Sequence, residues 1–483
     1  MGIHGLNSNE FASMAKSALA DEVQKGAIGK ATDTIRERRG AAVEQVEDWE
    51  GLRERARAIK AHTLAKLDHY LSQFVDQAEA RGVVVHWAAD ADEACRIISG
   101  LIDDACEASA DGEASAQELR ARPIVKAKSM VTEEIGLNHM LEERGLRPVE
   151  TDLGEWIQQL AGEPPSHIIV PAIHKTQQQI ADLFAEQVGG DANASAEELT
   201  AIARRILRQE FADAAVGISG VNFAIAESGS FLVLENEGNI RLTTSLPQTH
   251  IAVMGIEKLL PRLSDLDVFL RLLPRSGTGQ QLTTYQSLIT GLASANQDAD
   301  GNPVAEGPSA IHVVMVDHGR SDMLADELRR SSLQCIRCGA CLNVCPVYRQ
   351  IGGHAYGSVY PGPIGAVITP QLAGVEEARP LPFASSLCGA CGDVCPVKID
   401  LPELLLDLRK EAQQAGGSKI EQLGFGGWAW MMNAPWRYGL SLKLSRLMFP
   451  FGKHLPPFKK WGDGREFPKP AKRSFREQWR AKS

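Results

Sequence analysis

The stretch "LQCIRCGACLNVCP", residues 333 to 346, contains four cysteines and ends with a proline. The spacing is Cys-x2-Cys-x2-Cys-x3-Cys-Pro, and the cysteines are Cys335, Cys338, Cys341 and Cys345. Three cysteines separated by two residues each allow one loop to bind three corners of an iron–sulfur cube, and the fourth cysteine of this pattern binds a neighbouring cube in two-cluster ferredoxins. The stretch therefore predicts a module that holds two iron–sulfur clusters.

A second stretch, "SSLCGACGDVCP" at residues 385 to 396, repeats the pattern with one cysteine missing. Ser385 stands where a complete copy would have its first cysteine. If each motif gives its last cysteine to the cluster of the other motif, the first cluster is complete, and its predicted ligands are Cys335, Cys338, Cys341 and Cys395. The second cluster then receives only three thiolates, which are those of Cys345, Cys388 and Cys391.

The missing cysteine leaves three alternatives for the second cluster. It is a [3Fe-4S] cluster, a [4Fe-4S] cluster whose fourth iron is bound by Ser385 or by another group, or a labile site. Zinc is disfavoured, because a four-cysteine zinc site typically uses two Cys-x2-Cys pairs about fifteen to twenty residues apart. Disulfides are disfavoured as well, since the total of nine cysteines is odd and seven of them lie between Cys335 and Cys395.

Four regions follow from the patterning of the chain. Residues 1–80 are rich in Ala, Glu, Arg and Leu and predict an N-terminal helical segment. Residues 81–320 alternate between Val/Ile-rich runs and helical patterns, which predicts an α/β domain with a sheet covered by helices. Residues 321–417 hold the cysteines and predict a helical ferredoxin-like iron–sulfur domain. Residues 418–483 form a basic C-terminal extension rich in tryptophan and proline.

The apolar runs of the α/β region give specific expectations. The stretches "GVVVHWA", "HIIVPAI", "HIAVMG" and "IHVVMVD" are predicted strands, and "FAIAESGSFLVLENEGN" is a predicted hairpin that turns at Glu227, Ser228 and Gly229. After the cysteines, "DLPELLLDLRKEAQQAGG" predicts a helix that Asp400 caps and that ends at Gly416 and Gly417.

Charge and hydropathy indicate which partners and which cellular compartment suit the protein. From Trp436 to Ser483 there are 13 Lys and Arg residues against 3 Asp and Glu, while the whole chain has a net charge of −10. A basic extension of this kind suits an acidic partner protein or an anionic membrane surface, and the acidic body argues against nucleic acid. No apolar run is long enough for a transmembrane helix, and the start of the sequence has no signal-peptide core, so we expect a cytoplasmic protein.

The quoted motifs resemble one family. "CIRCGACLNVCPVYRQIGGHAYGSVYPGPIGAV" and "ASSLCGACGDVCPVKIDLPELLLDLRK" are similar to the lactate-utilisation iron–sulfur protein, the B component of a three-protein L-lactate oxidation system. Upstream, "KSMVTEEIGLNHMLEERGLRPVETDLGEWIQQLAGEPPSHIIVPAIHK" and "GVNFAIAESGSFLVLENEGN" resemble its lactate-utilisation (LUD) domain. The basic extension resembles the C-terminal part of the family, so the likeness covers nearly the whole chain.

The resemblance implies a function that the spacing alone does not give. It implies an electron-transfer subunit that works with a cysteine-rich subunit and a LUD-only subunit to oxidise L-lactate to pyruvate. It also implies that both clusters are [4Fe-4S] clusters. The alternatives are the iron–sulfur subunit of another 2-hydroxy-acid or glycerol-phosphate oxidase, and an α/β enzyme whose clusters are structural.

The α/β region also offers candidates for an anion pocket. Lys126 and Lys128 carry positive charge in "VKAKSMVTEE", and Gly277 and Gly279 precede a predicted helix whose free N–H groups could hold a carboxylate or phosphate. The competing interpretation is that these are turn glycines and surface charges. No GxGxxG or Walker motif occurs, so no dinucleotide or ATP site is predicted.

Overall fold

The computed structural model describes residues 3–108, 115–292, 296–297, 303–304, 307–416, 419–452 and 471–482. The chain divides into two compact units, Met1–Ala412 and Gln413–Ser483. The first unit contains the sheet and all nine cysteines, and the second contains the basic extension.

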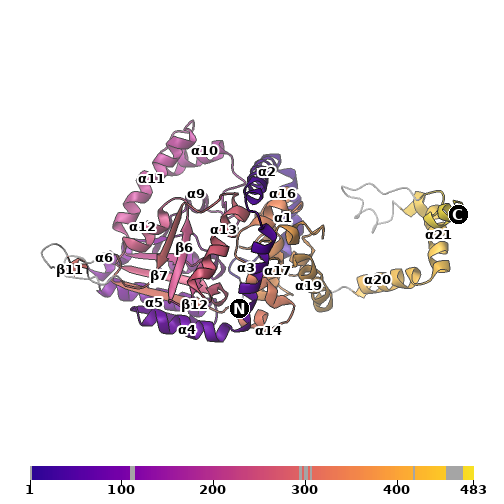
Figure 1. The fold of residues 1–483 in the computed structure, drawn as a ribbon. Coiled ribbons are helices and arrows are strands. Elements are labelled where there is room, and N and C mark those ends of the chain that lie inside the picture. Colours follow the sequence, from indigo (N-terminus) through magenta and orange to yellow (C-terminus); the bar gives the residue numbers. More distant parts are fainter. Residues whose placement is uncertain are drawn as a thin grey trace. The chain divides into compact units, whose positions relative to one another are not determined.

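A six-stranded parallel sheet forms the centre of the first unit, with the strand order β1-β12-β7-β4-β2-β3 (Figure 1). Its strands are β1 (Val83–Ala88), β2 (Pro123–Lys126), β3 (Arg147–Glu150), β4 (Val216–Gly220), β7 (Thr249–Gly255) and β12 (Ala310–Val316). Every residue of β7 is buried, which explains why this strand is apolar throughout. Successive side chains of β7 enter different cores, as expected for a strand with helices on both faces.

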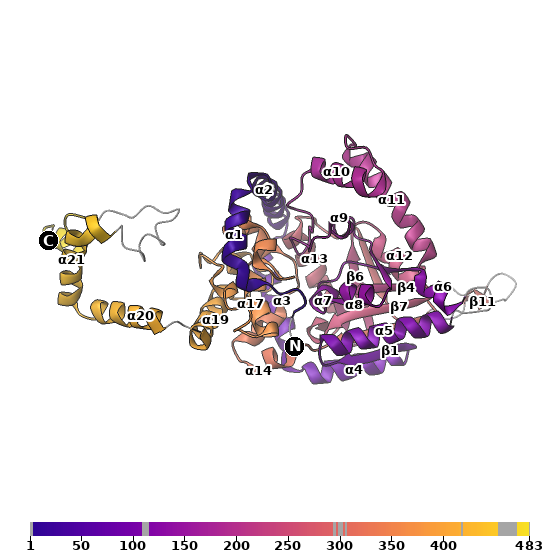
Figure 2. The ribbon, with the colours of Figure 1, turned by 180° about the vertical axis from the view of Figure 1, so that it is seen from behind.

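Helices on both faces bury the sheet, which confirms the predicted α/β fold. On one face α5, α7 and α8 pack against side chains such as Ile251 and Val253, and on the other α4 packs near Ala252 and Met254 (Figure 2). These helices are α4 (Leu67–Glu79), α5 (Ala91–Ala108), α7 (Met130–Glu134) and α8 (Leu137–Glu143). Three more helices pack with side chains of β2 and β3 in a core of their own, and they are α9 (Leu153–Ala161), α10 (Gln177–Val188) and α11 (Ala196–Asp213).

The predicted hairpin is confirmed and belongs to a second sheet with the order β8-β5-β6-β9. Its antiparallel strands β5 (Phe223–Ile225) and β6 (Ser230–Glu235) are joined through Gly229, which has a φ of 64°. The remaining elements here are β8 (Leu259–Leu260), β9 (Tyr285–Ile289), α12 (Asn239–Ser245) and α13 (Leu266–Gly277). A short pair, β10 (Asn296–Gln297) and β11 (Pro303–Val304), stands apart from both sheets.

One predicted strand is wrong. Residues 167–173, "HIIVPAI", form turns instead of a strand. The ring nitrogen Nδ1 of His167 accepts hydrogen bonds from the N–H groups of Ile169 and Val170 at 3.0 and 3.1 Å. These N–H groups are therefore not available for hydrogen bonds to a neighbouring strand. Pro171 has no N–H to offer to a neighbouring strand.

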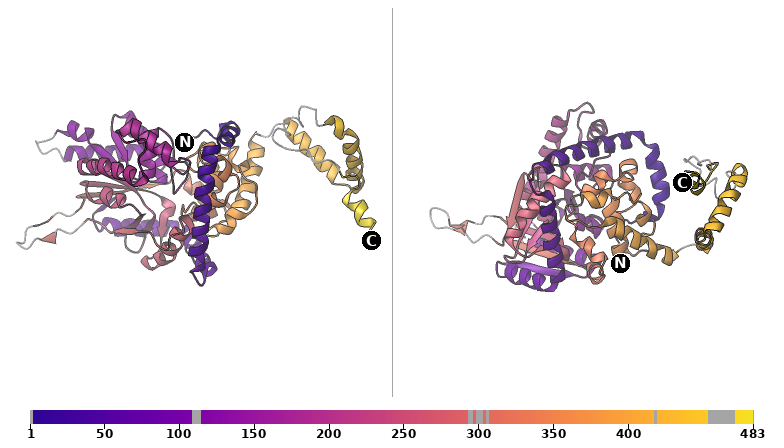
Figure 3. Two further views of the ribbon diagram at one scale, coloured as in Figure 1. Left: turned by 90° about the horizontal axis from the view of Figure 1, so that it is seen from above. Right: turned by 45° about the vertical axis from the view of Figure 1, so that its right-hand side comes forward.

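The N-terminal segment is helical, as predicted, and packs against the cysteine region. It contains α1 (Phe11–Ala20), α2 (Glu22–Glu44), α3 (Trp49–Ala65) and α4, after the short turn η1 (Ser8–Glu10). Ile28 of α2 and Leu52 of α3 are fully buried in the core that also holds α17 and five buried cysteines of the motifs. Figure 3 shows the indigo N-terminal helices beside the orange cysteine region in both views.

The cysteine region is helical, as the sequence predicts. Its elements are α14 (Arg320–Ala325), η4 (Arg329–Gln334), α15 (Ala340–Val344), α16 (Tyr348–Ile351), η5 (His354–Tyr356), α17 (Gly362–Ala373), η6 (Leu381–Phe383), α18 (Ala390–Val394) and α19 (Leu401–Gly416). At the start of α19 the carboxylate of Asp400 accepts the N–H of Glu403 at 3.1 Å, which confirms the predicted cap. Gly417, the other predicted end of this helix, lies outside the described residues.

The second unit consists of helices with exposed apolar side chains. It contains α20 (Lys419–Met432), α21 (Pro435–Gly452) and α23 (Phe475–Arg480), while residues 453–470 of the basic extension lie outside the described part. Leu423, Phe425, Trp428 and Trp430 of α20 are all exposed. Among the described residues, no helix is sufficiently long and apolar to span a lipid bilayer.

Candidate metal centre and adjoining cavity

The two cysteine motifs fold alike, with an offset of 50 residues. Arg337 and Leu387 hold the same position in the two motifs, and both are left-handed, with φ values of 59° and 54°. Gly339 and Gly389 follow, with φ values of 72° and 88°, and begin the short helices α15 and α18. A left-handed backbone is uncommon outside glycine, so its repetition at a non-glycine position marks a constrained loop.

The first side chain of each motif also accepts the same local hydrogen bond. The N–H of Arg337 donates to the sulfur of Cys335 at 3.4 Å, and the N–H of Leu387 donates to the hydroxyl oxygen of Ser385 at 3.1 Å. Ser385 therefore occupies, in the second motif, the position and the local hydrogen bond of Cys335 in the first.

Four cysteines from both motifs surround one small cavity of about 20 Å³. They are Cys335, Cys338, Cys341 and Cys395. Cys395 comes from the second motif, and Ile364 of α17 adds an apolar wall. The last cysteine of the second motif thus joins the first three of the other motif, as the interlocked arrangement requires.

The chemistry of this set fits a cluster. Burial raises the pKa of Cys341 well above its usual range and that of Cys395 to about 11, and neighbouring thiolates add to both increases. Such thiols remain protonated without positive charge beside them, and iron ions provide that charge. The N–H of Ile399 donates to the sulfur of Cys395 at 3.4 Å, a contact that stabilises a thiolate ligand.

The remaining three cysteines form a second group. Cys391 interacts electrostatically with Cys345 and Cys388, and Cys345 interacts with Cys388, so the three sulfurs lie near one another. Backbone N–H groups of Val347 and Tyr348 hydrogen-bond to Cys345 and lower its pKa, although burial dominates and raises it. Cys388 is exposed, whereas Cys338, Cys341 and Cys395 of the first group are buried.

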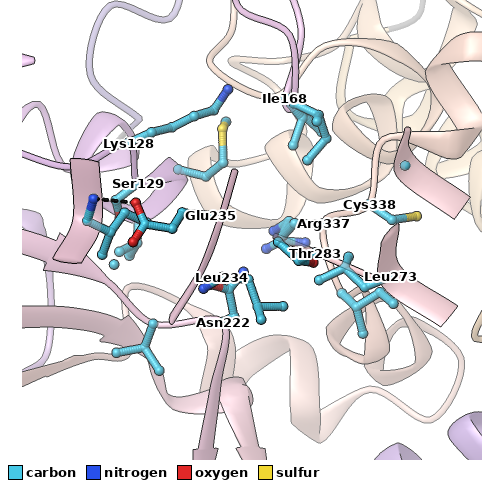
Figure 4. Close-up of a pocket in the computed structure, with 18 of the residues that line it drawn as sticks. Lys128, Ser129, Ile168, Asn222, Leu234, Glu235, Leu273, Thr283, Arg337 and Cys338 are labelled. Carbon is cyan, nitrogen blue, oxygen red and sulfur yellow. Dashed lines mark hydrogen bonds between the residues drawn. The ribbon is translucent and has the colours of Figure 1, made fainter. Parts of the chain in front are cut away.

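A larger cavity of about 310 Å³ lies between the α/β region and the first cysteine motif (Figure 4). Lys128, Ser129 and Glu235 line it from the α/β side, and Arg337 and Cys338 line it from the cysteine side. Cys338 lines both cavities, so the first group of cysteines borders the larger cavity through this residue.

The structure separates the two lysines that the sequence suggested for an anion pocket. Lys128 lines the larger cavity. Lys126 is fully buried elsewhere, where its ammonium group contacts the carboxylates of Glu133 and Glu150 at 2.9 and 2.7 Å. These carboxylates outweigh burial and raise the pKa of Lys126, so its charge is already neutralised within the protein.

The two glycines are also separated. Gly277 lines the cavity, but it ends α13 rather than preceding a helix, so the expectation of free helical N–H groups there is wrong. Gly279 has a φ of 74°, and a Cβ added to it would lie 2.5 Å from the backbone of Arg38. Its role is therefore to permit close packing of the chain against α2.

Sequence reasoning missed a buried ion-pair network that forms part of the cavity wall. The guanidinium of Arg320 contacts Glu134 at 2.8 and 2.9 Å and Glu257 at 2.7 Å, and all three side chains are buried. The hydroxyl of Tyr360 donates to Glu134 at 2.6 Å. These residues come from four distant segments, so no sequence spacing could have grouped them.

Comparisons with known proteins agree with this architecture. The lactate utilization protein B of Shouchella clausii (strain KSM-K16) is 44% identical over 481 residues, covering 98% of this chain and 97% of that protein. The chain belongs to the lactate utilization protein B family. The protein of the same name from Oceanobacillus iheyensis is 45% identical over 471 residues, covering 95% of this chain and 93% of its own. That from Bacillus pumilus (strain SAFR-032) is 42% identical over 482 residues, covering 98% of this chain and 97% of its own.

Three family models match successive segments of the chain. Residues 71–316 match the LUD domain, residues 331–399 match the 4Fe-4S dicluster domain, and residues 408–483 match the C-terminal region of lactate utilisation protein B. The dicluster match spans both cysteine motifs, which confirms the prediction of two iron–sulfur clusters.

Proposed function

We propose that this protein is the iron–sulfur electron-transfer subunit of a complex that oxidises L-lactate to pyruvate. The observation that carries the proposal is the placement of the two cysteine groups within one core. Three of the four cysteines of the first group are buried, and this group borders the cavity of the α/β region, whereas the second group has the exposed Cys388. Electrons taken up on the buried side can leave on the exposed side, which is the arrangement a relay needs.

The ligand sets follow from the grouping of the cysteines. The first cluster is held by Cys335, Cys338, Cys341 and Cys395, and the small cavity between these residues supports this set. The second is held by Cys345, Cys388 and Cys391, with the hydroxyl of Ser385 as the fourth ligand. The repeated left-handed loop and the repeated hydrogen bond to the opening side chain support Ser385. Both clusters are then [4Fe-4S] clusters, which supply one-electron transfer when they are bound.

Partner subunits complete the proposed complex. The relatives' name supports the other lactate-utilisation subunits as partners, one cysteine-rich and one with only a LUD domain. The basic extension and the exposed apolar side chains of α20 suit a contact with such a partner in the cytoplasm.

The test is reduction of the clusters by substrate. The three subunits are purified together without oxygen, and the electron paramagnetic resonance (EPR) spectrum is recorded after addition of L-lactate, of glycolate or of glycerol 3-phosphate. We expect reduced-cluster signals with L-lactate only. Reduction by one of the other substrates would favour a different oxidase, and clusters that even dithionite does not reduce would favour a structural role.

A further inference from the structure

The larger cavity lies where open α/β sheets bind ligands. After β2 the chain continues to β3 on one side, whereas after β4 it continues to β7 on the other side, so the strand order reverses between the adjacent β2 and β4. Ligands of such sheets bind at this reversal, beyond the carboxyl ends of the strands. The segments that follow β2 and β4 line the cavity, with Lys128 and Ser129 from the first and Val221 and Asn222 from the second.

Arg337 presents a free hydrogen-bond donor to this cavity. Its side chain is 9% exposed, and its Nη1 has no hydrogen-bond partner among the described residues. Its Nη2 lies 3.7 Å from Glu257, and its guanidinium stacks on Tyr360 at 4.9 Å from the ring centroid. These contacts fix the plane of the guanidinium while leaving one edge for an anion, and a planar guanidinium is well suited to a carboxylate.

Lys128 is a second cation without a partner. Its ammonium nitrogen is buried, and the described part of the chain offers it neither a hydrogen bond nor an ion pair. Glu155 and Glu237 act on it electrostatically without a hydrogen bond or an ion pair to it, and burial raises the pKa of both carboxyls. A buried ammonium without a partner is destabilising, so its retention calls for a ligand.

The acids that line the cavity already have donors. The carboxylate of Asp152 accepts the N–H groups of Gly154 and Glu155 at 3.0 and 3.2 Å. Glu235 accepts the N–H groups that open α12, at 2.6 and 2.9 Å, and Glu237 accepts the N–H of Leu153 at 3.1 Å. Glu257 also lines the cavity; one of its oxygens accepts from Arg320 at 2.7 Å, and the other has no hydrogen bond among the described residues and lies 3.7 Å from Arg337 Nη2. The cationic donors left without a hydrogen bond at the cavity are Arg337 Nη1 and the ammonium of Lys128, which indicates an anionic ligand.

We propose that this cavity binds a small organic acid anion, with its carboxylate on Arg337 beside Cys338 and with Lys128 as the second cation. The site rests on the proposed function, because its position next to the first cluster makes the ligand a modulator of the electron transfer through this cluster. An anion beside the cluster disfavours the extra negative charge of reduction, so binding lowers the midpoint potential. By linkage, reduction weakens anion binding by the same factor.

The experiment uses the full-length holoprotein, purified without oxygen and titrated calorimetrically with sodium L-lactate against sodium chloride of equal ionic strength. L-lactate binds to the unaltered protein, and Lys128→Gln weakens binding about 10- to 100-fold, the effect of losing a hydrogen bond to a charged group. Lys25→Gln, which removes an exposed lysine paired with Glu22, leaves binding unchanged. L-lactate also changes the EPR signal of the first cluster in the unaltered protein but not in Lys128→Gln.

Thermal unfolding in the absence of lactate separates binding from folding. Because Lys128 has no partner, Lys128→Gln does not lower the melting temperature Tm, whereas a structural lysine would lower it. Equal binding by Lys128→Gln and the unaltered protein, or no binding to either while dithionite still reduces both clusters, overturns the site but not the proposed function. Binding of inorganic phosphate as tight as that of L-lactate overturns the carboxylate class.

Discussion

The Arg53 guanidinium of α3 donates to the carbonyl oxygen of Cys395 through Nε at 3.0 Å and through Nη2 at 2.8 Å. The same Nη2 reaches the carbonyl oxygen of Asp393 at 2.8 Å. Arg53 is 7% exposed and lies more than 300 residues away in sequence. The N-terminal helices thus fix the turn that carries the last cysteine of the second motif.

Arg53→Met should make the first cluster labile. Losing Arg53 leaves the carbonyl oxygen of Cys395 with only the N–H of Lys398 at 3.1 Å and removes the arginine donor from the carbonyl oxygen of Asp393. A hydrogen bond from a charged donor is worth about 1.5–3 kcal/mol. We expect faster loss of the first cluster's EPR signal in the presence of an iron chelator, while the second cluster's signal persists. Arg57→Met on the same helix is the control, since Arg57 is exposed and contacts only Glu54 among the described ion pairs. Equal lability of both variants would contradict the role of Arg53.

Cys395→Ala tests the interlocked ligand sets. Although this residue lies in the second motif, we expect its loss to remove or convert the first cluster and to leave the second cluster's signal intact. Cys391→Ala should do the reverse. Iron and sulfide analysis with EPR under anoxia measures both. Cys106→Ala is the control, because Cys106 is buried in a separate core beneath the sheet. The ligand sets would be wrong if Cys395→Ala abolished the second signal alone.

Ser385 gives a prediction about cluster type. Ser385→Ala removes the proposed fourth ligand, so we expect the second site to convert to a three-iron cluster, with about one iron less per chain than the unaltered protein. Ser385→Cys should retain four irons at this site and raise its midpoint potential, because a thiolate replaces a harder oxygen ligand. Mössbauer spectra and potentiometric titration measure the two effects. Ser386→Ala, one position along the same loop, should change neither, and unchanged spectra in Ser385→Ala would exclude the serine as a ligand.

Arg320→Met should destabilise the first unit strongly. It leaves Glu134 and Glu257 buried without their partner, and breaking a buried ion pair from one side costs about 3–5 kcal/mol. For a unit that spans Met1–Ala412 we expect Tm to fall by about 3–6 °C in calorimetry under anoxia. Arg262→Met removes a pair with Asp265 whose arginine side chain is 66% exposed, so its effect should be about 0–1 kcal/mol. Equal shifts in the two variants would show that the network does not contribute as described.

The exposed side chains of α20 give a prediction about assembly. Trp428 and Trp430 are 54% and 60% exposed, and apolar side chains grouped on one short helix mark a contact surface. The double variant Trp428→Ala, Trp430→Ala should reduce co-purification of the partner subunits and leave the iron content unchanged. Leu19→Ala, at an exposed apolar residue of α1, is the control. Unchanged co-purification would assign the partner contact to another surface.

The sequence predicted most of the fold where patterns are long or specific. The helices of residues 1–80, the strands β1, β7 and β12 and the hairpin were all evident from period and composition. The short strands β2, β3 and β4 were not predicted. A run of four or five residues, such as "PIVK", is too short for its hydrophobic pattern to distinguish a strand from a loop. The stretch 167–173 had the right composition for a strand, but the ring of His167 and the proline at 171 prevent one.

The candidate site was predictable only in its cysteines. Their spacing predicts the two groups, because cluster ligation imposes a strict local pattern, and in the structure Cys395 lies with the first three cysteines and Cys345 with Cys388 and Cys391. The exchange of ligands itself stays a prediction. The cavity could not be predicted in this way. Arg337 lies between Cys335 and Cys338, and its sequence pattern predicts only a loop residue. It lines the same cavity as Lys128 because two distant regions of the chain pack together. Of the four residues suggested for an anion pocket, only Lys128 and Gly277 line it.

The proposed exchange of cysteines between the motifs has a consequence for the order of maturation. Cys395 is made 60 residues after Cys335, so a nascent chain that has only its first motif has the ligands of neither proposed cluster complete. A product that ends before the second motif would carry four cysteines, Cys335, Cys338, Cys341 and Cys345, without the remaining ligands of either set. With these ligand sets, both cofactors can be completed only after the second motif has been synthesised.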